Sequence, residues 1–210
     1  MRKPIFRLTF ILLALMAAGD SFAQTSFGIK AGPDLANLTT KIGGAKGSSN
    51  AIIGVAGGVY ANLPVAPMLE VQPSLLYEGK GEVQSVQGYN IRTRLNYLTL
   101  PVDLLYTAEM AGGGGWMIGV GPYLGYGISG KVSGGPQGSY GGNPFKADEG
   151  SLKRLDAGGH IQLGYEMANG FNIGLNAELG LMNLARHGDK KNSIKNTSFG
   201  LMLGYVFGKY

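Results

Sequence analysis

Few residues of this sequence could do nucleophilic or metal chemistry. It contains no cysteine and 2 histidines, so a thiolate zinc site and a cysteine nucleophile are excluded. His160 falls in phase with Asp156 and Arg154 in an alternating segment. A histidine beside an acid and a serine is the arrangement of hydrolytic and acyl-transfer enzymes. Spacing alone does not supply the geometry that catalysis needs, so we favour His160 as one hydrogen-bonding side chain in a barrel interior. We predict no enzyme and no catalytic, metal or cofactor site.

Charged and amide side chains recur on one face of the alternating segments. We expect that face to line the lumen of a barrel, with a polar network of Lys30, Glu70, Gln72, Asp103, Arg154, Asp156, His160, Glu166 and Glu178. Because buried charges must be paired or hydrated, we predict structural pairs across the lumen. A barrel of about eight strands has just enough room for side chains, so a wide diffusion pore is not expected.

Two polar stretches are candidates for surface binding. The glycine-rich stretch 131–149 lacks the Walker spacing and its closing Lys-Ser/Thr, so it is not a phosphate-binding loop. Its aromatic residues Tyr140 and Phe145 could bind a partner or a surface polysaccharide, although a tolerant surface loop is the commoner case. The second stretch is basic and includes Arg186, His187, Lys190, Lys191 and Lys195. It could contact anionic lipopolysaccharide or be a solvated loop.

The elements that position these residues are predicted strands. From Gln24 onward, apolar residues alternate with polar or small ones in blocks separated by polar, glycine-rich gaps. In the clearest block, Phe171, Ile173 and Leu175 share one face, and this period of two is typical of a strand with one apolar face. We predict about eight strands, at 26–33, 51–63, 67–79, 92–108, 115–130, 151–168, 171–184 and 195–208.

The connections and the aromatic residues favour an outer-membrane barrel. Gaps after the first, third, fifth and seventh blocks exceed those after the second, fourth and sixth, as periplasmic turns and longer extracellular loops would. Asn169-Gly170 fits a tight hairpin turn. Aromatic residues gather near the short-turn end at Phe27, Tyr106, Trp116, Tyr165, Phe171 and Phe207, and near the long-loop end at Tyr77, Tyr126 and Phe199. A bilayer's two interfaces select two such belts.

A secreted, lipocalin-like soluble barrel is the main alternative, with an apolar interior and a polar exterior. The polar faces are too sparse and too rich in glycine to cover a soluble exterior, whereas the apolar faces are nearly free of charge, as lipid requires. Pro73, Pro101 and Pro122 argue the other way, because each removes a ladder hydrogen bond. Bulges or barrel bends could absorb them.

Composition and the N-terminus agree with export of one domain. The 210 residues suit a single domain, and a hydrophobic content of 44% argues against disorder. No dense Lys/Arg stripe accompanies the net charge of +5, so nucleic-acid binding is not expected. Arg2, Lys3 and Arg7 precede an apolar stretch and the small-x-small site that ends at Ala23. We therefore predict a cleaved signal peptide at 1–23 and a barrel domain at 24–210.

Several segments resemble the PorT-like outer-membrane β-barrel proteins of Bacteroidetes. These are FGIKAG at 27–32, EVQPSLLY at 70–77 followed by GKG at 79–81, YLTLP at 97–101, GPYLG at 121–125 and GLMNL at 180–184. The resemblance spans the mature chain in the expected order and accounts for the strand prolines. There are two departures: many relatives carry Glu where Ser74 stands, and the last in-phase aromatic, Phe207, is followed by three further residues. The resemblance implies fold and location, and the founding member takes part in secretion and gliding-associated export.

We therefore predict an all-β, antiparallel, up-and-down transmembrane barrel with a filled lumen in the bacterial outer membrane. The favoured function is a non-enzymatic envelope component or an accessory of a secretion or surface-assembly system. The alternatives are a barrel that binds a ligand or partner through its extracellular loops and, less favoured, a lumen-based membrane enzyme. Expected partners are outer-membrane lipid and lipopolysaccharide, the outer-membrane assembly machinery and secretion-system proteins, with no cofactor and no nucleic acid.

Overall fold

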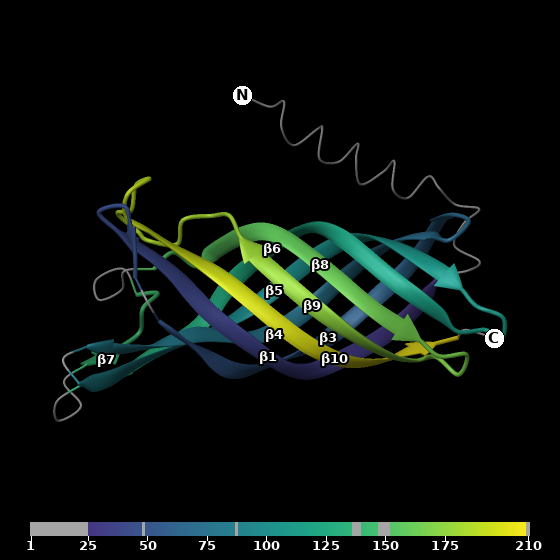
Figure 1. The fold of residues 1–210 in the computed structure, drawn as a ribbon, viewed down its shortest axis with the longest axis horizontal. Coiled ribbons are helices and arrows are strands. Elements are labelled where there is room, and N and C mark those ends of the chain that lie inside the picture. Colours follow the sequence, from purple (N-terminus) through teal and green to yellow (C-terminus); the bar gives the residue numbers. More distant parts are fainter. Residues whose placement is uncertain (1–24, 48, 87, 136–139, 147–151, 209–210) are drawn as a thin grey trace.

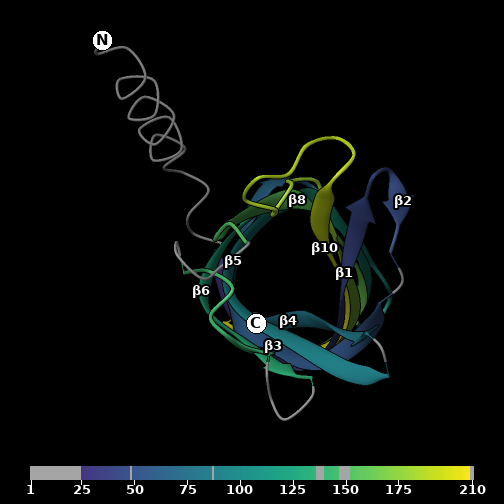
Figure 2. The same cartoon turned by 90° about the vertical axis from the view of Figure 1, so that its left-hand side faces the viewer.

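Antiparallel strands wind around a common axis and close into a barrel (Figures 1 and 2). The computed structural model describes residues 25–47, 49–86, 88–135, 140–146 and 152–208, so the predicted signal peptide lies outside the described residues. The strands are β1 (Ser26–Ile42), β2 (Ala45–Lys46), β3 (Asn50–Ala66), β4 (Leu69–Val86), β5 (Tyr89–Glu109), β6 (Gly115–Gly134), β7 (Tyr140–Gly142), β8 (Leu155–Glu166), β9 (Phe171–Gly180) and β10 (Ser193–Phe207). Within these ranges, no helix is long and apolar enough to cross a membrane.

Sequence order sets the barrel's order, and the last strand returns to the first. Around the ring the strands follow as β1, β3, β4, β5, β6, β8, β9 and β10, and β10 pairs with β1 to close it. The pairs Phe27 with Phe207 and Leu35 with Phe199 fix that closure. The short strands β2 and β7 pair with β1 and β6 as additions beyond the ring. The predicted fold class is therefore confirmed.

The two ends of the barrel differ in their connections. One end, here called the turn end, has the connections 67–68, 110–114 and 167–170. At Asn169-Gly170 the backbone N–H of Phe171 donates to Asn169 Oδ1 at 3.2 Å, and Gly170 has φ 86°, a conformation that glycine adopts without strain. The opposite end, the loop end, carries 43–49, 87–88, 135–154 and 181–192.

Strand bounds differ from prediction mostly at the loop end. Segment 80–91, expected as a gap, is mostly strand, because β4 runs to Val86 and β5 starts at Tyr89. The loop-end connection between them spans only 87–88, so the expected alternation of long and short gaps fails there. Likewise β1 extends to Ile42, β8 starts at Leu155 instead of 151, and β9 ends at Gly180 instead of 184. Polar residues pair across β4 and β5 in this part, where apolar residues no longer alternate. Ser85 pairs with Asn90, and the Ser85 hydroxyl donates to Asn90 Oδ1 at 2.8 Å.

The prolines sit in the ladder without shifting it. Pro73 pairs with Val102, and Leu76 pairs with Thr99. Both pairs have the same register, so the alignment of β4 with β5 does not change across Pro101. The register shifts instead fall between Ala51 and Ala56, between Pro64 and Ala66, and between Asn96 and Tyr97. Of the two alternatives, bulges or bends, bulges therefore do not absorb these prolines.

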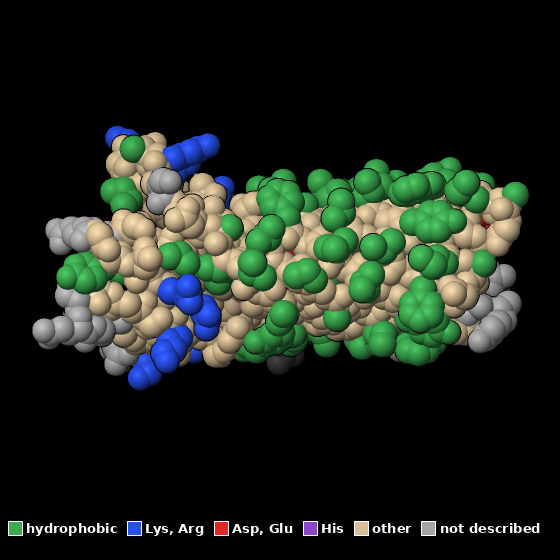
Figure 3. Space-filling model, turned by 60° about the horizontal axis from the view of Figure 1, so that its bottom comes forward, with side chains coloured by type: hydrophobic (Ala, Val, Ile, Leu, Met, Phe, Trp, Pro, Cys, Tyr) green, Lys and Arg blue, Asp and Glu red, His purple; other side chains and the backbone are tan. Residues whose placement is uncertain are grey.

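The outward face is apolar and the inward face is polar. Leu163, Leu175 and Leu201 are exposed side by side on neighbouring strands, and hydrophobic side chains cover most of the barrel's length in Figure 3. At the turn end, edge-on ring contacts join Trp116 to Tyr165 at 5.3 Å and Phe171 to Tyr205 at 5.0 Å. A lipocalin-like soluble barrel has the opposite arrangement.

Candidate functional site

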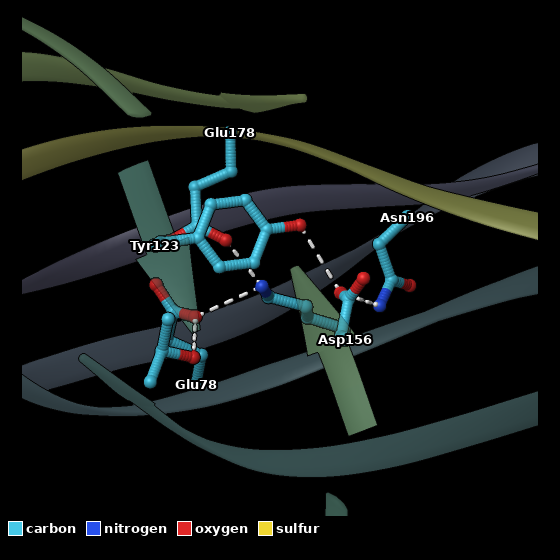
Figure 4. A network of polar contacts seen from close by, with 7 residues as sticks. Glu78, Tyr123, Asp156, Glu178 and Asn196 are labelled. Carbon is cyan, nitrogen blue, oxygen red and sulfur yellow. Dashed lines mark hydrogen bonds and ion pairs between the residues drawn. The ribbon is translucent and has the colours of Figure 1, made fainter. Parts of the chain in front are cut away.

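Lys80 lies in the middle of the lumen between two carboxylates. Its Nζ lies 2.9 Å from Glu78 Oε2 and also donates to Glu178 Oε2 (Figure 4). The Thr99 hydroxyl donates to the same Glu78 oxygen at 2.5 Å. Lys80 is 1% exposed, so its charge is compensated by protein and not by water. We call these residues the Lys80 cluster.

The barrel's closure positions this cluster. Glu78 and Lys80 are alternate residues of β4, so both side chains point inward. Glu178 belongs to β9, which lies four strands from β4 in either direction around the ring. The contact between Lys80 and Glu178 therefore crosses the lumen and joins opposite walls.

Aromatic rings and a third acid complete this level of the lumen. Lys80 Nζ lies 5.5 Å from the centre of the Tyr97 ring and 5.1 Å from that of Tyr123, within the range of a cation–π interaction. The Tyr123 hydroxyl donates to Asp156 Oδ2 at 3.1 Å, and Asn196 Nδ2 donates to the same oxygen at 2.7 Å (Figure 4). The three carboxylates and the two rings restrict the space through which an ion could pass.

A second polar chain lies on the turn-end side of the first. His160 Nδ1 is 2.7 Å from Asp103 Oδ2, and Gln162 Nε2 donates to that oxygen at 2.9 Å. Gln162 also donates to Gln72 Oε1 at 2.9 Å, and Gln72 in turn donates to Asn62 at 2.8 Å. Within the described ranges, no Ser or Thr hydroxyl forms a hydrogen bond with His160. The pair of His160 and Asp103 is thus built into a hydrogen-bonded wall.

The remaining predicted lumen residues divide into three kinds. Lys30 is buried with its Nζ 5.4 Å from the centre of the Tyr60 ring. Glu166 is buried and Glu70 is half-buried in phase with Gln72 on β4. Arg154 departs from prediction, because it precedes β8 and its Nη1 donates to the backbone oxygen of Gly127 at 2.7 Å. It binds carbonyls at the loop end and does not pair with the lumen acids among the described residues.

An apolar plug closes the lumen at the loop end. Its buried members come from two strands, β1 and β5, and two loops and are Leu38, Leu95, Tyr97, Phe145, Leu152 and Leu184. Phe145 packs edge-on against Tyr97 with ring centres 5.8 Å apart. The Arg154 guanidinium carbon lies over the Phe145 ring, 5.3 Å from its centre. The ring fits because Gly127 has no side chain: a Cβ there would lie 2.4 Å from Phe145 Cζ.

The plug corrects the prediction for Phe145. We expected this residue to offer an exposed aromatic contact, but it is 3% exposed because the loop folds back into the barrel mouth. Leu152 N donates to the Pro144 backbone oxygen at 3.0 Å and holds that fold. Tyr140 belongs to β7, and its side chain lies outside the described part.

Hydrogen bonds also order the loop 181–192. Asn183 Nδ2 donates to the backbone oxygens of Asp189 and Asn192, and Gly43 N donates to Asn192 Oδ1 at 3.0 Å. The Asp189 carboxylate accepts from the backbone N–H of Asn192 and of Lys191, and these bonds hold its pKa below the ordinary value. Lys190 and Lys191 are therefore presented, exposed, on an ordered loop.

Sequence reasoning missed the centre of this site. The predicted lumen network lacks Glu78, Lys80, Thr99 and Asn196. Only Lys80 lies outside the predicted strands, one residue beyond 67–79, whereas the other three lie inside 67–79, 92–108 and 195–208. Glu78 and Lys80 continue the inward phase of Gln72, so an unbroken count of two along β4 would have found them. Across the described ranges, no group of His, Cys, Asp and Glu is arranged to hold a metal ion.

Comparisons with known proteins agree with this architecture. A family model described as "Outer membrane protein beta-barrel domain" matches residues 22–186. Ail, the attachment invasion locus protein of Yersinia pestis, solved in complex with the heparin analogue sucrose octasulfate, is similar at 16% identity and TM-score 0.45, over 87% of this chain and 99% of that chain. Neisserial surface protein A is similar at 10% identity and TM-score 0.49, over 89% and 99%. The outer membrane protein OprG of Pseudomonas aeruginosa is similar at 12% identity and TM-score 0.46, over 87% of this chain and 95% of that chain. No curated protein matches.

Substituting Lys80 by Met tests whether the cluster stabilises the barrel. The change leaves Glu78 and Glu178 facing each other without a cation, so we expect the free energy of unfolding to fall by about 3–5 kcal/mol. Urea unfolding in lipid vesicles, followed by the fluorescence of the single tryptophan, Trp116, measures it. Lys190→Met on the exposed loop is the control and should change little. Equal stability of Lys80→Met and wild type would contradict this account.

Substituting Gly127 by Val tests the plug. The new side chain would occupy the space of the Phe145 ring, so we expect the loop around Phe145 to leave the barrel mouth and trypsin to cut sooner at Lys146 and Lys153. Gly141→Val is the matched control, since a Cβ at Gly141 meets nothing within 4 Å. Unchanged cleavage of Gly127→Val would show that the plug does not depend on this contact.

Proposed function

Because the chain belongs to the outer membrane protein β-barrel domain family, we propose that it is a closed, non-enzymatic barrel that serves as a structural component of the envelope or as an accessory of a secretion or surface-assembly system. The protein lies in the outer membrane. Outer-membrane barrels place short turns in the periplasm and longer loops outside the cell, so the turn end is periplasmic and the loop end is extracellular.

The filled lumen is the observation that carries this proposal. Two hydrogen-bonded levels of side chains, around Lys80 and around Asp103, occupy the interior, and the apolar plug covers them at the extracellular end. A diffusion porin instead keeps a polar, water-filled channel. Such an interior supports a barrel whose role depends on its walls and loops.

The same interior supports a non-enzymatic role. His160 is 1% exposed and its Nδ1 contacts Asp103, so the pair is buried within the wall. General acid–base catalysis needs the reacting group within hydrogen-bonding reach of the base. The arrangement instead suits His160 as a structural donor or acceptor within the wall.

The secretion accessory role rests on the resemblance to PorT-like barrels. Four of the segments that carry it lie in the walls: FGIKAG in β1, EVQPSLLY in β4, YLTLP in β5 and GPYLG in β6. The fifth, GLMNL, runs from the last residue of β9 into the loop 181–192, where Leu184 joins the plug. Lys80 of the GKG segment that follows EVQPSLLY is the centre of the lumen network. The resemblance therefore coincides with the parts that build the closed interior.

A second candidate function is surface binding of a ligand or partner. The ordered loop 181–192 favours it, because the backbone N–H groups of Lys191 and Asn192 donate to the Asp189 carboxylate, and the adjacent Lys190 and Lys191 are exposed. Ordering before binding lowers the entropic cost of association. An anionic surface polysaccharide or protein is the kind of ligand that this loop suits.

A deletion strain separates these roles. We expect a group of exported proteins to disappear from the medium and accumulate in the periplasm, as measured by comparing the secreted proteome with that of the complemented parent. Complementation with Lys190→Gln/Lys191→Gln should restore secretion if the loop lysines serve a separate binding role. An unchanged secreted proteome would remove the secretion role, and unchanged entry of a large hydrophilic antibiotic would remove the structural one.

A further inference from the structure

The outward face of β5 and β6 changes character step by step toward the extracellular end. Directly paired residues form four successive rungs: Leu98 with Tyr126, Asn96 with Ser129, Arg94 with Lys131, and Arg92 with Ser133. Paired residues on antiparallel strands point to the same side of the sheet. The wall therefore passes from apolar through amide and hydroxyl to cationic side chains. Figure 3 shows Lys and Arg gathered at this end of the barrel, beyond the hydrophobic band.

A bulge in β6 places Lys131 on this outward face. The register shifts by one residue between Asn96 and Tyr97, which gives β6 an extra residue at Ile128. If the register continued unshifted, Lys131 would pair with Thr93, and its side chain would point to the inward side of the wall, the side on which Leu95 is fully buried. The bulge instead sets Lys131 opposite Arg94, and bulges commonly re-aim side chains in this way.

On the described strands, no acidic residue is paired with any of the three cations. Arg94 is flanked by Gly81 on β4 and Lys131 on β6, and Arg92 by Val83 and Ser133. Glu82 pairs with Thr93, so it lies in the opposite phase of the sheet. In the part of the chain that the structure describes, none of Arg92, Arg94 and Lys131 forms an ion pair, and all three are exposed.

This arrangement costs stability unless an anion joins it. Like charges directly opposite each other on neighbouring strands are destabilising. Arg94 and Lys131 are such a pair, and Arg92 adds a third cation on the same face of β5. An anion placed between them would convert the repulsion into attraction, and a guanidinium group binds phosphate with two parallel hydrogen bonds.

The height of the cations identifies the anion. Leu98 and Tyr126 are exposed at the extracellular edge of the apolar face, where tyrosine rings sit at the membrane interface. Arg94 lies four residues further along β5, about 10 Å along the barrel axis for a tilted strand. That is the level of lipid headgroups, and the side chains face sideways into the membrane, away from the loop tips.

We propose that Arg92, Arg94 and Lys131 form a lateral binding site for the phosphorylated sugar headgroup of an outer-leaflet lipid. The hydroxyl and amide rung of Ser129 and Asn96, joined by a hydrogen bond of 2.8 Å, lies beneath it at the level of the headgroup's sugar and acyl carbonyl groups. The site depends on the outer-membrane location and not on a role in secretion. It would anchor the barrel's extracellular rim in the lipid that surrounds it.

The test compares two variants with the same change in charge. One removes the wall cations, Arg92→Gln/Arg94→Gln/Lys131→Gln, and the other removes loop cations, Lys46→Gln/Lys190→Gln/Lys191→Gln. Each full-length protein is folded into vesicles of phosphatidylcholine alone or with added bis-phosphorylated lipid A. The unfolding temperature is read from the gel mobility of unboiled samples, and lipid A binding is read by titration.

Lipid A should raise the unfolding temperature of the wild type and of the loop variant but not that of the wall variant, which should bind lipid A at least about tenfold more weakly. In phosphatidylcholine alone the wall variant should be as stable as wild type or more so, because the repulsion between Arg94 and Lys131 is gone. Lys131→Gln alone should likewise be as stable as wild type or more so in phosphatidylcholine and should lose the stabilisation by lipid A. This single variant replaces the triple variant if the triple variant does not fold.

Three results would overturn the proposal. Equal loss of lipid A binding in the wall and loop variants would show that lipid A binds through general attraction to positive charge and not at a specific site. Unchanged binding by the wall variant would place the lipid elsewhere. Inorganic phosphate or soluble heparin stabilising the wild type as strongly as lipid A, through the same three residues, would identify a soluble anion as the ligand.

Discussion

An ammonium group buried in the middle of a membrane barrel must be neutralised by other buried groups, and the rest of this interior follows from that requirement. Lys80 lies between Glu78 and Glu178, and Thr99 and two tyrosine rings complete its surroundings. Removing two or three such charges from water costs several kcal/mol each, and good geometry repays it only when every partner is present. The contact from β4 to β9 therefore requires the closed ring of strands, and it holds opposite walls at a fixed separation.

The two faces of the same strands meet opposite demands. Acids outnumber bases inside, where only Lys30 and Lys80 are cationic among the described residues, whereas exposed cations gather on the extracellular rim. Alternate side chains of β5 serve both demands at once, because Leu95 enters the plug while Arg94 and Arg92 face outward. The bulge at Ile128 maintains this separation on β6. A single strand thus contributes to the seal of the lumen and to the surface that faces lipid headgroups.

Alternation with a period of two was enough to predict the barrel, its eight walls, its apolar exterior and most inward acids, because lipid outside and polar atoms inside leave a signal at every second residue. The same alternation was not enough to predict the residues at which the strands end. The stretch containing Lys80 reads as a polar gap, yet its residues pair across β4 and β5. The sequence pattern predicts Phe145 as an exposed loop aromatic, but its ring occupies space left by the absence of a side chain at Gly127. That contact joins a loop to a strand, and residue spacing along the sequence does not encode it. Arg154 has the phase of a lumen residue, but it stands just before β8 begins and binds carbonyls instead.

The central claim is that side chains close the lumen, and the electrical conductance of the purified barrel in a planar lipid bilayer tests it most directly. With the Lys80 cluster joining opposite walls and the plug covering it, the account predicts no steady current above that of the bare bilayer at moderate voltage. A stable, ohmic single-channel current that disappears when the protein is heat-denatured would contradict the account, because ions would then pass the space that Lys80, Glu78 and Glu178 occupy.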